Sequence, residues 1–378
     1  MGRLNTLFAQ HGAAYLQRFA ATMPAVHQKA LGALRACRTP SAGMLLCACP
    51  DCDRSRLVPR SCGNRHCPTC QGAKAFAWLQ RQCARALPTH HFMITFTVPA
   101  PLRAFLRSHP RIGHEALFAA SSAAIKTLAA NPRYGLGDTP GFFGVLHTWG
   151  RTLEYHPHIH YVVPGGALDR DDARWHASSP GFFLPVRVLS ILYRAKFRDA
   201  MARDGLIGQI DPAVWSVHWN VHCQPVGNAH NALAYLSRYV FKVAIGNERI
   251  LDINDTHVRF NYTASNSHRR RTMTLTIAEF IRRFLQHVLP TGFMKVRYYG
   301  FLSPSFKRSF DEIRARVEIA HGFEVEAPAV PDSPPPQPLR CEHCGAPMRR
   351  VRVISARPIT TLSRTRHAAV APAFAAGP

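Results

Sequence analysis

The sequence has 378 residues, of which 47% are hydrophobic, so it can form a globular protein with a sizeable core and more than one domain. It carries 47 Lys+Arg against 22 Asp+Glu, a formal net charge of +25, which favours a polyanionic partner, most often nucleic acid. No stretch approaches the ~18 apolar residues of a membrane span, and the first residues lack a signal-peptide core, so we expect neither a membrane protein nor a secreted one.

In chain order, apolar periodicity, turn residues and β-branched clusters predict the elements that follow. We expect a helix at 13–38 interrupted at Pro24, a cysteine-rich loop region at 47–70, a helix at 73–86, a strand at 91–99, a helix at 101–130 interrupted at Pro110, strands at 141–150 and 156–166, a helix at 186–202, a strand at 214–225 and a helix at 228–246. Strands mixed with helices in this way indicate an α+β fold with a sheet buried on one face.

The composition changes along the chain suggest three segments. Residues 1–88 would form a helical and zinc-binding, DNA-binding domain, and residues 89–322 would form the α+β domain. Residues 323–378 begin with the Pro-rich run "EVEAPAVPDSPPPQPLR" and read as a linker and a disordered C-terminal tail. That last segment also holds Cys341 and Cys344, half of a metal site, which would bind no metal or share one with His343.

Six of the 11 cysteines lie between Cys47 and Cys70, which indicates metal binding in a reducing compartment rather than disulfides. Two CxxC pairs can each offer two thiolates from a tight turn and together complete a tetrahedral Zn²⁺ site. We expect this ion to be structural, because four ligands leave no open position for chemistry. The predicted ligands are Cys49, Cys52, Cys67 and Cys70, with Cys62 and His66 as possible substitutes and Cys47 as a further donor.

The surface around this predicted zinc site is strongly basic. Residues 1–90 contain 12 Lys+Arg and two Asp+Glu. This balance predicts that the N-terminal module docks on the DNA backbone.

The run "EYHPHIHYVVPGG" places histidines at alternate positions of a predicted strand. His158 and His160 would project from one face, about 6.6 Å apart at their Cα atoms, and can converge on one metal ion. His156 lies on the same face but at the start of the strand, too far along for the same ion. The third ligand stays open among His147, Glu154 and His222. The alternative is a half-exposed strand that carries polar histidines without a metal.

The run "YLSRYVFK" places Tyr235 and Tyr239 four residues apart, and therefore on one face of the predicted helix, with Lys242 continuing the stripe. A tyrosine is a poor nucleophile at neutral pH and becomes plausible only beside a cation or a metal. Lys242 and Arg238 could neutralise charge on a pentavalent phosphorus. The alternative is that both tyrosines pack in the core.

Together these motifs resemble the two-tyrosine HUH endonucleases, and in particular the rolling-circle transposases of the insertion sequence 91 family. The resemblance covers most of the chain: "SCGNRHCPTCQ" is similar to the family's zinc-binding domain, "FTVP" to its first strand, "HTWGRTLEYHPHIHYVVPGG" to its metal-site region, "YLSRYVFKVAI" to its tyrosine helix and "EFIRRFLQHVLPTGFMKVRYYGFL" to the closing block of its catalytic domain.

The resemblance implies a ferredoxin-like antiparallel sheet with the histidines on a central strand. It implies that His158 and His160 bind Mg²⁺ or Mn²⁺, and that Tyr235 or Tyr239 attacks single-stranded DNA at an element end to give a 5′-phosphotyrosine. It also implies action on target DNA, reliance on host replication and helicase machinery, and a cytoplasmic, nucleoid-associated location in a bacterium. A rolling-circle replication initiator and a non-catalytic zinc DNA-binding protein are the alternatives.

Overall fold

The computed structural model describes residues 2–169, 174–227, 233, 244–264, 269–322 and 339–355. The chain divides into two compact units, each made of segments that are distant in sequence. Unit 1 comprises Met1–Arg35 and Cys62–Gln337, and unit 2 comprises Ala36–Ser61 and Pro338–Pro378. These units cut across the three consecutive segments expected from the sequence, because a strand of the C-terminal segment pairs with a strand near residue 46.

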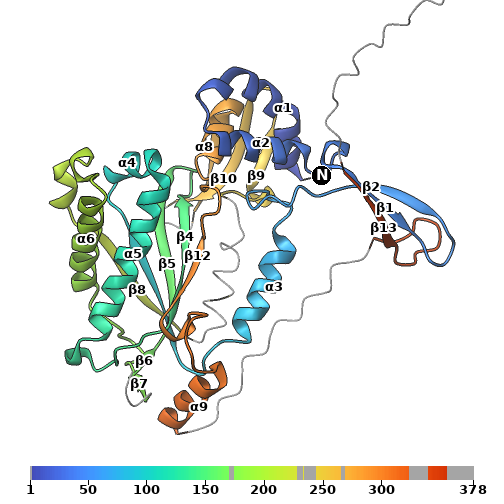
Figure 1. Ribbon diagram of the computed structural model, residues 1–378. Helices are drawn as coiled ribbons and strands as arrows, with labels where there is room; N and C mark the ends of the chain where they lie inside the picture. Colours follow the sequence, from blue (N-terminus) through green and yellow to red (C-terminus); the bar gives the residue numbers. More distant parts are fainter. Residues whose placement is uncertain are drawn as a thin grey trace, which may run out of the picture. The chain divides into compact units, whose positions relative to one another are not determined.

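Figure 1 shows the helices and strands along the chain. The elements of unit 1 are α1 (Arg3–Phe19), α2 (Ala25–Ala36), α3 (Gly72–Cys83), β3 (His91–Thr97), α4 (Leu102–Ser108), α5 (Pro110–Ala129), β4 (Phe142–Trp149), β5 (Tyr155–Pro164), β6 (Gly166–Leu168), β7 (Trp175–Ala177), α6 (Val186–Arg203), β8 (Asn220–Gly227), β9 (Ile250–Ile253), β10 (His257–Thr263), β11 (Arg270–Thr276), α8 (Ile277–Leu285), β12 (Val296–Tyr299) and α9 (Phe310–His321). Those of unit 2 are β1 (Met44–Ala48), β2 (Ser55–Pro59) and β13 (Arg349–Ile354).

Proline sets several of these boundaries, as the sequence predicts. α1 and α2 are separate helices on either side of Pro24, and α5 begins at Pro110 directly after α4. Proline is tolerated in the first turn of a helix but not in its interior, where it removes a hydrogen bond and clashes with the preceding turn. The predicted interruptions in the helices at 13–38 and 101–130 are therefore confirmed.

The strand expected at 214–225 begins later than predicted. Residues Pro212–Trp215 instead form a 3₁₀ turn, because the side chain of Asp211 accepts a hydrogen bond from the backbone N–H of Ala213. Such a side-chain bond to the second residue on offers the backbone an alternative to a strand. Most of the helix expected at 228–246 lies outside the described residues.

The centre of unit 1 is a five-stranded sheet in the order β12-β4-β5-β3-β8, in which every neighbouring pair is antiparallel. The expectation of a mixed helix and strand fold with an antiparallel sheet is confirmed. β5, the histidine strand, is the middle strand of this sheet. Helices α5 and α6 lie together over one face (Figure 1).

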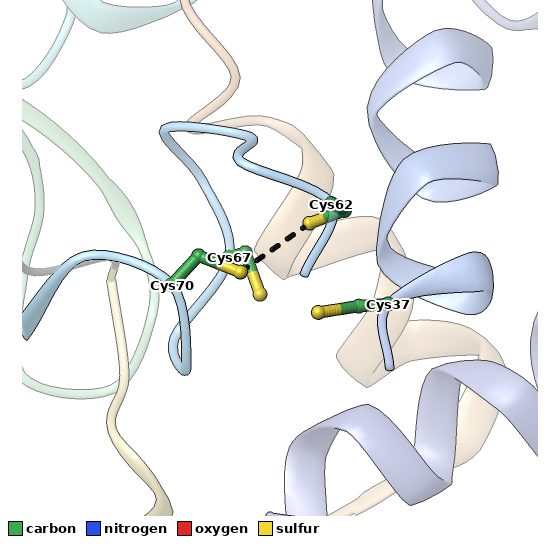
Figure 2. Close-up of side chains that lie close together, drawn as sticks. All are labelled: Cys37, Cys62, Cys67 and Cys70. Atoms are coloured by element: carbon green, nitrogen blue, oxygen red, sulfur yellow. Dashed lines mark hydrogen bonds between the residues drawn. The ribbon is translucent and has the colours of Figure 1, made fainter. Parts of the chain in front are cut away.

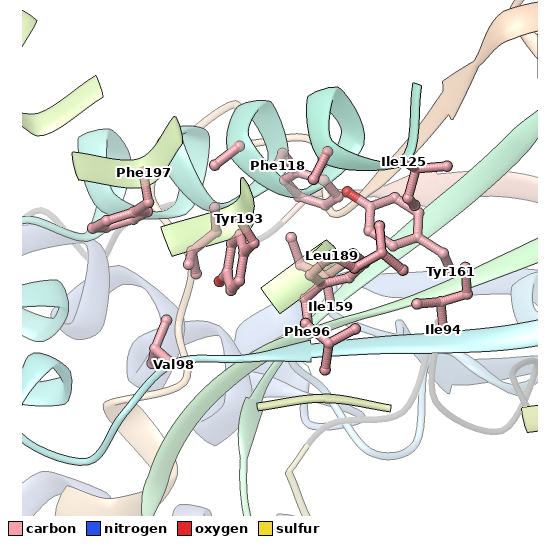
Figure 3. Packing of buried hydrophobic residues seen from close by; sticks show 14 of the residues in the cluster. Ile94, Phe96, Val98, Phe118, Ile125, Ile159, Tyr161, Leu189, Tyr193 and Phe197 are labelled. Atoms are coloured by element: carbon pink, nitrogen blue, oxygen red, sulfur yellow. The ribbon is translucent and has the colours of Figure 1, made fainter. Parts of the chain in front are cut away.

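The main hydrophobic core lies between that face and these helices. Alternate residues of the strands point into it, among them Phe96 on β3 and Ile159 on β5, which are register partners. Phe118 on α5 and Tyr193 on α6 meet them from the helical layer (Figure 3). Because side chains alternate along a strand, the residues between these core positions must face the other side of the sheet, and His158 and His160 are among them.

A second core covers part of that other face. Trp78 of α3 packs edge-on against Phe143 of β4, with ring centroids 5.8 Å apart. Val162 and Leu233 belong to the same cluster. Farther along the same face, the polar residues of β4 and β5 begin where this apolar packing ends.

Two smaller sheets complete unit 1. β9, β10 and β11 form an antiparallel sheet that packs on α8 through Phe260 and Phe280, with ring centroids 6.0 Å apart. α8 also packs against α1, through Phe284 and Phe8, with ring centroids 4.9 Å apart. β6 and β7 form a short hairpin.

Unit 2 is a three-stranded sheet in the order β13-β1-β2. Its strand β13, with the turn before it, lies within the segment expected to be a disordered tail, so that expectation is corrected for residues 339–355. Residues 323–338 and 356–378 lie outside the described part of the chain. Within the described residues, no helix combines the length and apolar character needed to cross a membrane.

The core predicts a large stability effect at Phe96, which is fully buried and packs edge-on against Tyr161 and Tyr193. Phe96→Ala should lower the free energy of unfolding by about 3–5 kcal/mol, because it removes the contacts of the ring and leaves a cavity. The exposed Ile191→Ala on α6 is the matched control and should change it by less than about 0.5 kcal/mol. Urea unfolding followed by tryptophan fluorescence measures both, and equal effects would contradict this description of the core.

Candidate active site

Three histidines from two neighbouring strands converge on the polar part of the sheet face. His147 of β4 is the direct register partner of His158 of β5, and His160 follows two residues later on the same face. Ring centroids are 5.3 Å apart for His147 and His158, 4.7 Å for His147 and His160, and 4.8 Å for His158 and His160. One ligand nitrogen from each ring lies within 4.8 Å of the others. These three nitrogens can bind one metal ion, and because such an ion takes at least four ligands, at least one position is left for another group.

Hydrogen bonds orient two of the three rings. Nδ1 of His158 lies 2.7 Å from the backbone oxygen of His156, and can only donate to it, so Nε2 is the nitrogen left for a metal. Nδ1 of His160 lies 2.8 Å from Oγ1 of Thr95 on the adjacent strand β3. Such contacts on the far nitrogen fix the ring position and are the usual support of a histidine ligand.

The environment keeps these histidines neutral, which is the form that binds metal. Burial, followed by repulsion from the neighbouring imidazoles, holds the pKa of His147 and of His158 well below the usual value. Burial, and then repulsion from His156, lowers the pKa of His160 to about 4. No proton therefore has to be displaced from these rings before they bind a cation at neutral pH.

The other two candidates for the third ligand are not part of this group. His222 on β8 is exposed and lies opposite Thr95, which in turn lies opposite His160. It is thus two strands from His160, or roughly 9.6 Å at the usual strand spacing. Glu154 precedes β5, and its carboxylate accepts hydrogen bonds from the backbone and side chain of Thr152.

A partly buried lysine, Lys295, lies near His147. The ring of Trp149 stacks on His147 with centroids 5.0 Å apart, and Nζ of Lys295 lies 4.7 Å from the centre of the Trp149 ring. Burial, followed by repulsion from Arg65, lowers the pKa of Lys295 to about 7. Trp149 and Lys295 line a cavity of about 300 Å³ together with His66 and Ala244. Lys295 falls in the closing block of the resemblance but was not predicted from the sequence.

A strongly basic cavity of about 320 Å³ lies beside the histidine strand. Its lining includes Arg103 and Arg107 of α4, Arg282 and Arg283 of α8, and Glu154. Arg103 is close enough to His158 to contribute to its lowered pKa. Nε of Arg103 is buried and makes no hydrogen bond to any described residue. Sequence periodicity gave no sign of this cavity, because its arginines come from α4 and α8, two helices that are distant in the sequence.

The cysteines form two clusters rather than the single site expected. Cys49 and Cys52 do not lie with Cys67 and Cys70. Each CxxC pair belongs to a different group, and two residues from elsewhere in the sequence complete each group. The first group is Cys37, Cys62, Cys67 and Cys70, and the second is Cys49, Cys52, Cys341 and Cys344. Within each group the sulfur atoms all lie within 4.8 Å of one another.

Figure 2 shows the first cluster, with the four sulfur atoms turned toward a common centre. Sγ of Cys62 and Sγ of Cys70 lie 3.7 Å apart. Interactions with Cys62 contribute most to lowering the pKa of Cys67 to about 4, so this thiol is already biased toward the thiolate that binds metal. Nδ2 of Asn5 donates to Sγ of Cys67 at 3.6 Å, a contact that supports the ligand from outside. The cluster fits a structural Zn²⁺ ion.

Of the three alternative zinc donors, only one belongs to a cysteine cluster. Cys62 belongs to the first cluster, as the sequence allowed. His66 and Cys47 belong to neither cluster. Burial, followed by repulsion from Arg65, lowers the pKa of His66 to about 3. Cys37, which follows α2 directly, has no CxxC partner, and for that reason the sequence gave no signal for it.

The predicted nucleophile region lies outside the described residues, and this includes Tyr235, Tyr239 and Lys242. The nearest described residues on either side are Leu233 and Ala244. Leu233 packs in the cluster that contains Phe143 and Val162, on the histidine face of the sheet. Ala244 lines the cavity that contains Trp149.

Known proteins resemble the chain along most of its length. A family model described as "Transposase zinc-binding domain" matches residues 7–98, and one described as "Putative transposase" matches residues 141–309. "Putative transposase y4qJ" of Sinorhizobium fredii is 36% identical over 348 residues, covering 87% of this chain and 86% of its own length. The "Transposase for insertion sequence element IS801" of Pseudomonas savastanoi pv. phaseolicola is 28% identical over 361 residues, covering 85% and 82%. No solved structure matches the chain.

Proposed function

The chain belongs to the transposases of the insertion sequence 91 family, and from this premise we propose that it nicks and rejoins single-stranded DNA at element ends through a 5′-phosphotyrosine intermediate. The observation that carries the proposal is the group formed by His147, His158 and His160. It is a neutral set of three ligands on one face of a sheet, in a protein with a net charge of +25.

Imidazole ligands suit transition metals, whereas Mg²⁺ is a hard cation that prefers oxygen ligands, and a set of only three ligands suits a catalytic role rather than a structural one. We propose His147 as the third ligand beside His158 and His160, and of the two ions Mg²⁺ and Mn²⁺ the donor set fits Mn²⁺ better. When bound, such an ion would supply Lewis-acid polarisation of a phosphate oxygen. Thr95 and the backbone of His156 hold the rings that face it.

Tyr235 and Tyr239 are the proposed nucleophiles. Leu233, which precedes them, packs in the same cluster as residues of β4 and β5. Ala244, which follows them, lines the same cavity as Trp149 of β4. These positions support attack at this face of the sheet. In the proposed step the phenol oxygen bonds to phosphorus and the bond from phosphorus to the 3′ oxygen breaks. The phenol loses its proton and the 3′ oxygen gains one, giving a free 3′-OH. Lys242 would offset charge on the phosphorus in the transition state.

The phosphodiester bond is exchanged rather than hydrolysed in this scheme. Its free energy is retained in the tyrosyl ester, so the reverse attack by a 3′-OH rejoins a strand without ATP. The second tyrosine would act on the other end or on the target DNA. Unwinding and copying would depend on host helicase and replication proteins, and the protein would act at the bacterial nucleoid.

A test of this function is covalent capture. Purified protein incubated with single-stranded DNA that carries an element end should form an adduct stable to denaturing gel electrophoresis when Mn²⁺ or Mg²⁺ is present. A non-catalytic zinc DNA-binding protein would bind the DNA and give no adduct. A replication initiator would give the adduct but would not move an element between two plasmids, whereas a transposase does.

The basic cavity predicts the path of the DNA next to the histidines. Arg103→Gln combined with Arg107→Gln should weaken binding of single-stranded DNA without added metal. It should also reduce the slope of log affinity against log salt by about 1.4, since each lost phosphate contact contributes about 0.7. Fluorescence anisotropy over a salt series measures both quantities.

Arg133→Gln is the matched control, because Arg133 is an exposed arginine on a different turn. It should leave the salt slope unchanged. If Arg133→Gln lowers the salt slope as much as the double variant does, the arginines of the cavity contact DNA no more than an exposed arginine elsewhere does.

A further inference from the structure

The second cysteine cluster lies wholly within unit 2. Cys49 and Cys52 come from the turn that joins β1 to β2, and Cys341 and Cys344 come from the segment before β13. We propose that these four cysteines bind a second Zn²⁺ ion, and that this ion fastens residues 339–355 to the hairpin of β1 and β2.

The sulfur positions match a tetrahedral zinc site. Sγ of Cys49 lies 3.4 Å from that of Cys344, and Sγ of Cys52 lies 3.6 Å from those of Cys341 and Cys344. Four thiolates bound at the usual Zn–S length would be about 3.8 Å apart along the edges of the tetrahedron. A disulfide needs about 2.05 Å between sulfurs, and all four cysteines are free thiols.

The two CxxC turns are built alike. In each, the N–H four residues after the first cysteine donates to the carbonyl of that cysteine: Asp53 to Cys49 at 3.1 Å, and Gly345 to Cys341 at 2.9 Å. Both residues have positive φ, 54° for Asp53 and 74° for Gly345. In both turns the first cysteine's own N–H donates to the carbonyl five residues on. Two matched turns that present two thiolates each are the two halves of one tetrahedral site.

Unit 2 has little else to hold it together. Among its described residues the buried hydrophobic side chains are cysteines, namely Cys37, Cys47, Cys49 and Cys341. All six residues of β13 are exposed. The ion pair between Arg56 and Glu342 is 2.6 Å long but 47% and 75% exposed, so it contributes little. A module this small without an apolar core needs a metal or a covalent crosslink to fold.

This site extends beyond the zinc-binding domain of the family match. That match covers residues 7–98, which include all four cysteines of the first cluster and Cys49 and Cys52 of the second, but neither Cys341 nor Cys344. The second site would link residues that are 289 and 295 positions apart in the sequence. Residues 339–355 would then be a structural part of unit 2, held to residues 36–61, rather than a tail.

The metal content of the full-length protein tests the first part of this proposal. Elemental analysis of the purified chain should find about two zinc ions per chain, one for each tetrathiolate site. Cys341→Ser combined with Cys344→Ser should lower this to about one. Cys223→Ser, a thiol of β8 outside both clusters, is the matched control and should keep about two. About one zinc in the wild type, or about two in the double variant, overturns the proposal.

A cleavage experiment tests the fastening, and it does not depend on DNA chemistry. A specific protease site placed within residues 326–332 allows the chain to be cut after folding. The C-terminal fragment should stay bound through size-exclusion chromatography and should separate when a strong zinc chelator is added. A fragment that separates with zinc present, or stays bound after complete zinc removal, contradicts the role given to this ion.

Discussion

Replacing both Tyr235 and Tyr239 with phenylalanine should abolish the covalent adduct with single-stranded DNA, while the affinity for that DNA changes by less than about twofold. Phenylalanine keeps the ring and its packing but has no oxygen to attack phosphorus, so chemistry is lost and binding is retained. Denaturing gels measure the adduct, and fluorescence anisotropy measures the binding. Each single variant should retain the adduct that the remaining tyrosine forms.

Tyr134→Phe is the matched control for this change, because Tyr134 lies in a short turn after α5 and packs against the main core, on the side of the sheet opposite the histidines. It should form the adduct at the wild-type rate. An adduct that persists in the double variant would show that neither tyrosine is the nucleophile.

The second large effect concerns the metal ligands. His147→Ala and His158→Ala should each slow adduct formation by about 10³-fold, because each removes a ligand from an ion worth several kcal/mol in the transition state. Burst kinetics with Mn²⁺ measure the rate. DNA binding without metal should be unchanged, since the imidazoles are neutral and give no charge to a phosphate.

His222→Ala and Glu154→Gln are sharp controls, since the sequence allowed either residue as the third ligand. Both should stay within a fewfold of the wild-type rate, because neither belongs to the histidine group. A severe loss of rate in His222→Ala together with a mild loss in His147→Ala would show that β8, and not β4, supplies the third ligand.

Much of the fold could be predicted from local sequence patterns. Proline placed the breaks between helices, and β-branched and aromatic runs located β3, β4 and β5. β6, β7 and β9 escaped prediction because strands of three or four residues carry few alternating residues, whereas β10 and β11 were missed although each has seven residues. The family resemblance drawn from the motifs is confirmed by the matches along the chain.

The cysteine pairing could not be derived from spacing. Cys49-x2-Cys52 and Cys67-x2-Cys70 have the spacing of one complete site, but spacing does not say which pairs meet in space. Strand pairing decides it here, because β1 lies beside β13 and brings Cys341 and Cys344 to Cys49 and Cys52. One local signal was present: a residue that tolerates positive φ follows the second cysteine in both "CPDCD" and "CEHCG".

The choice of His147 needed the register between two strands. Its place opposite His158 depends on how the chain turns between β4 and β5, and a shift of one residue would move His147 to the other face of the sheet. The pair at His158 and His160 needed only the alternation of one strand, so the sequence could predict it.

The central proposal is that a tyrosine at the histidine face becomes joined to DNA, and peptide mass spectrometry of the adduct tests it most directly. Protein reacted with a single-stranded element end in Mn²⁺ and digested with trypsin should yield a nucleotide-bearing peptide modified at Tyr235 or Tyr239, and His158→Ala should yield far less of it after the same reaction time. Modification at any other residue, or an equal yield of the same peptide from His158→Ala, would contradict the proposal.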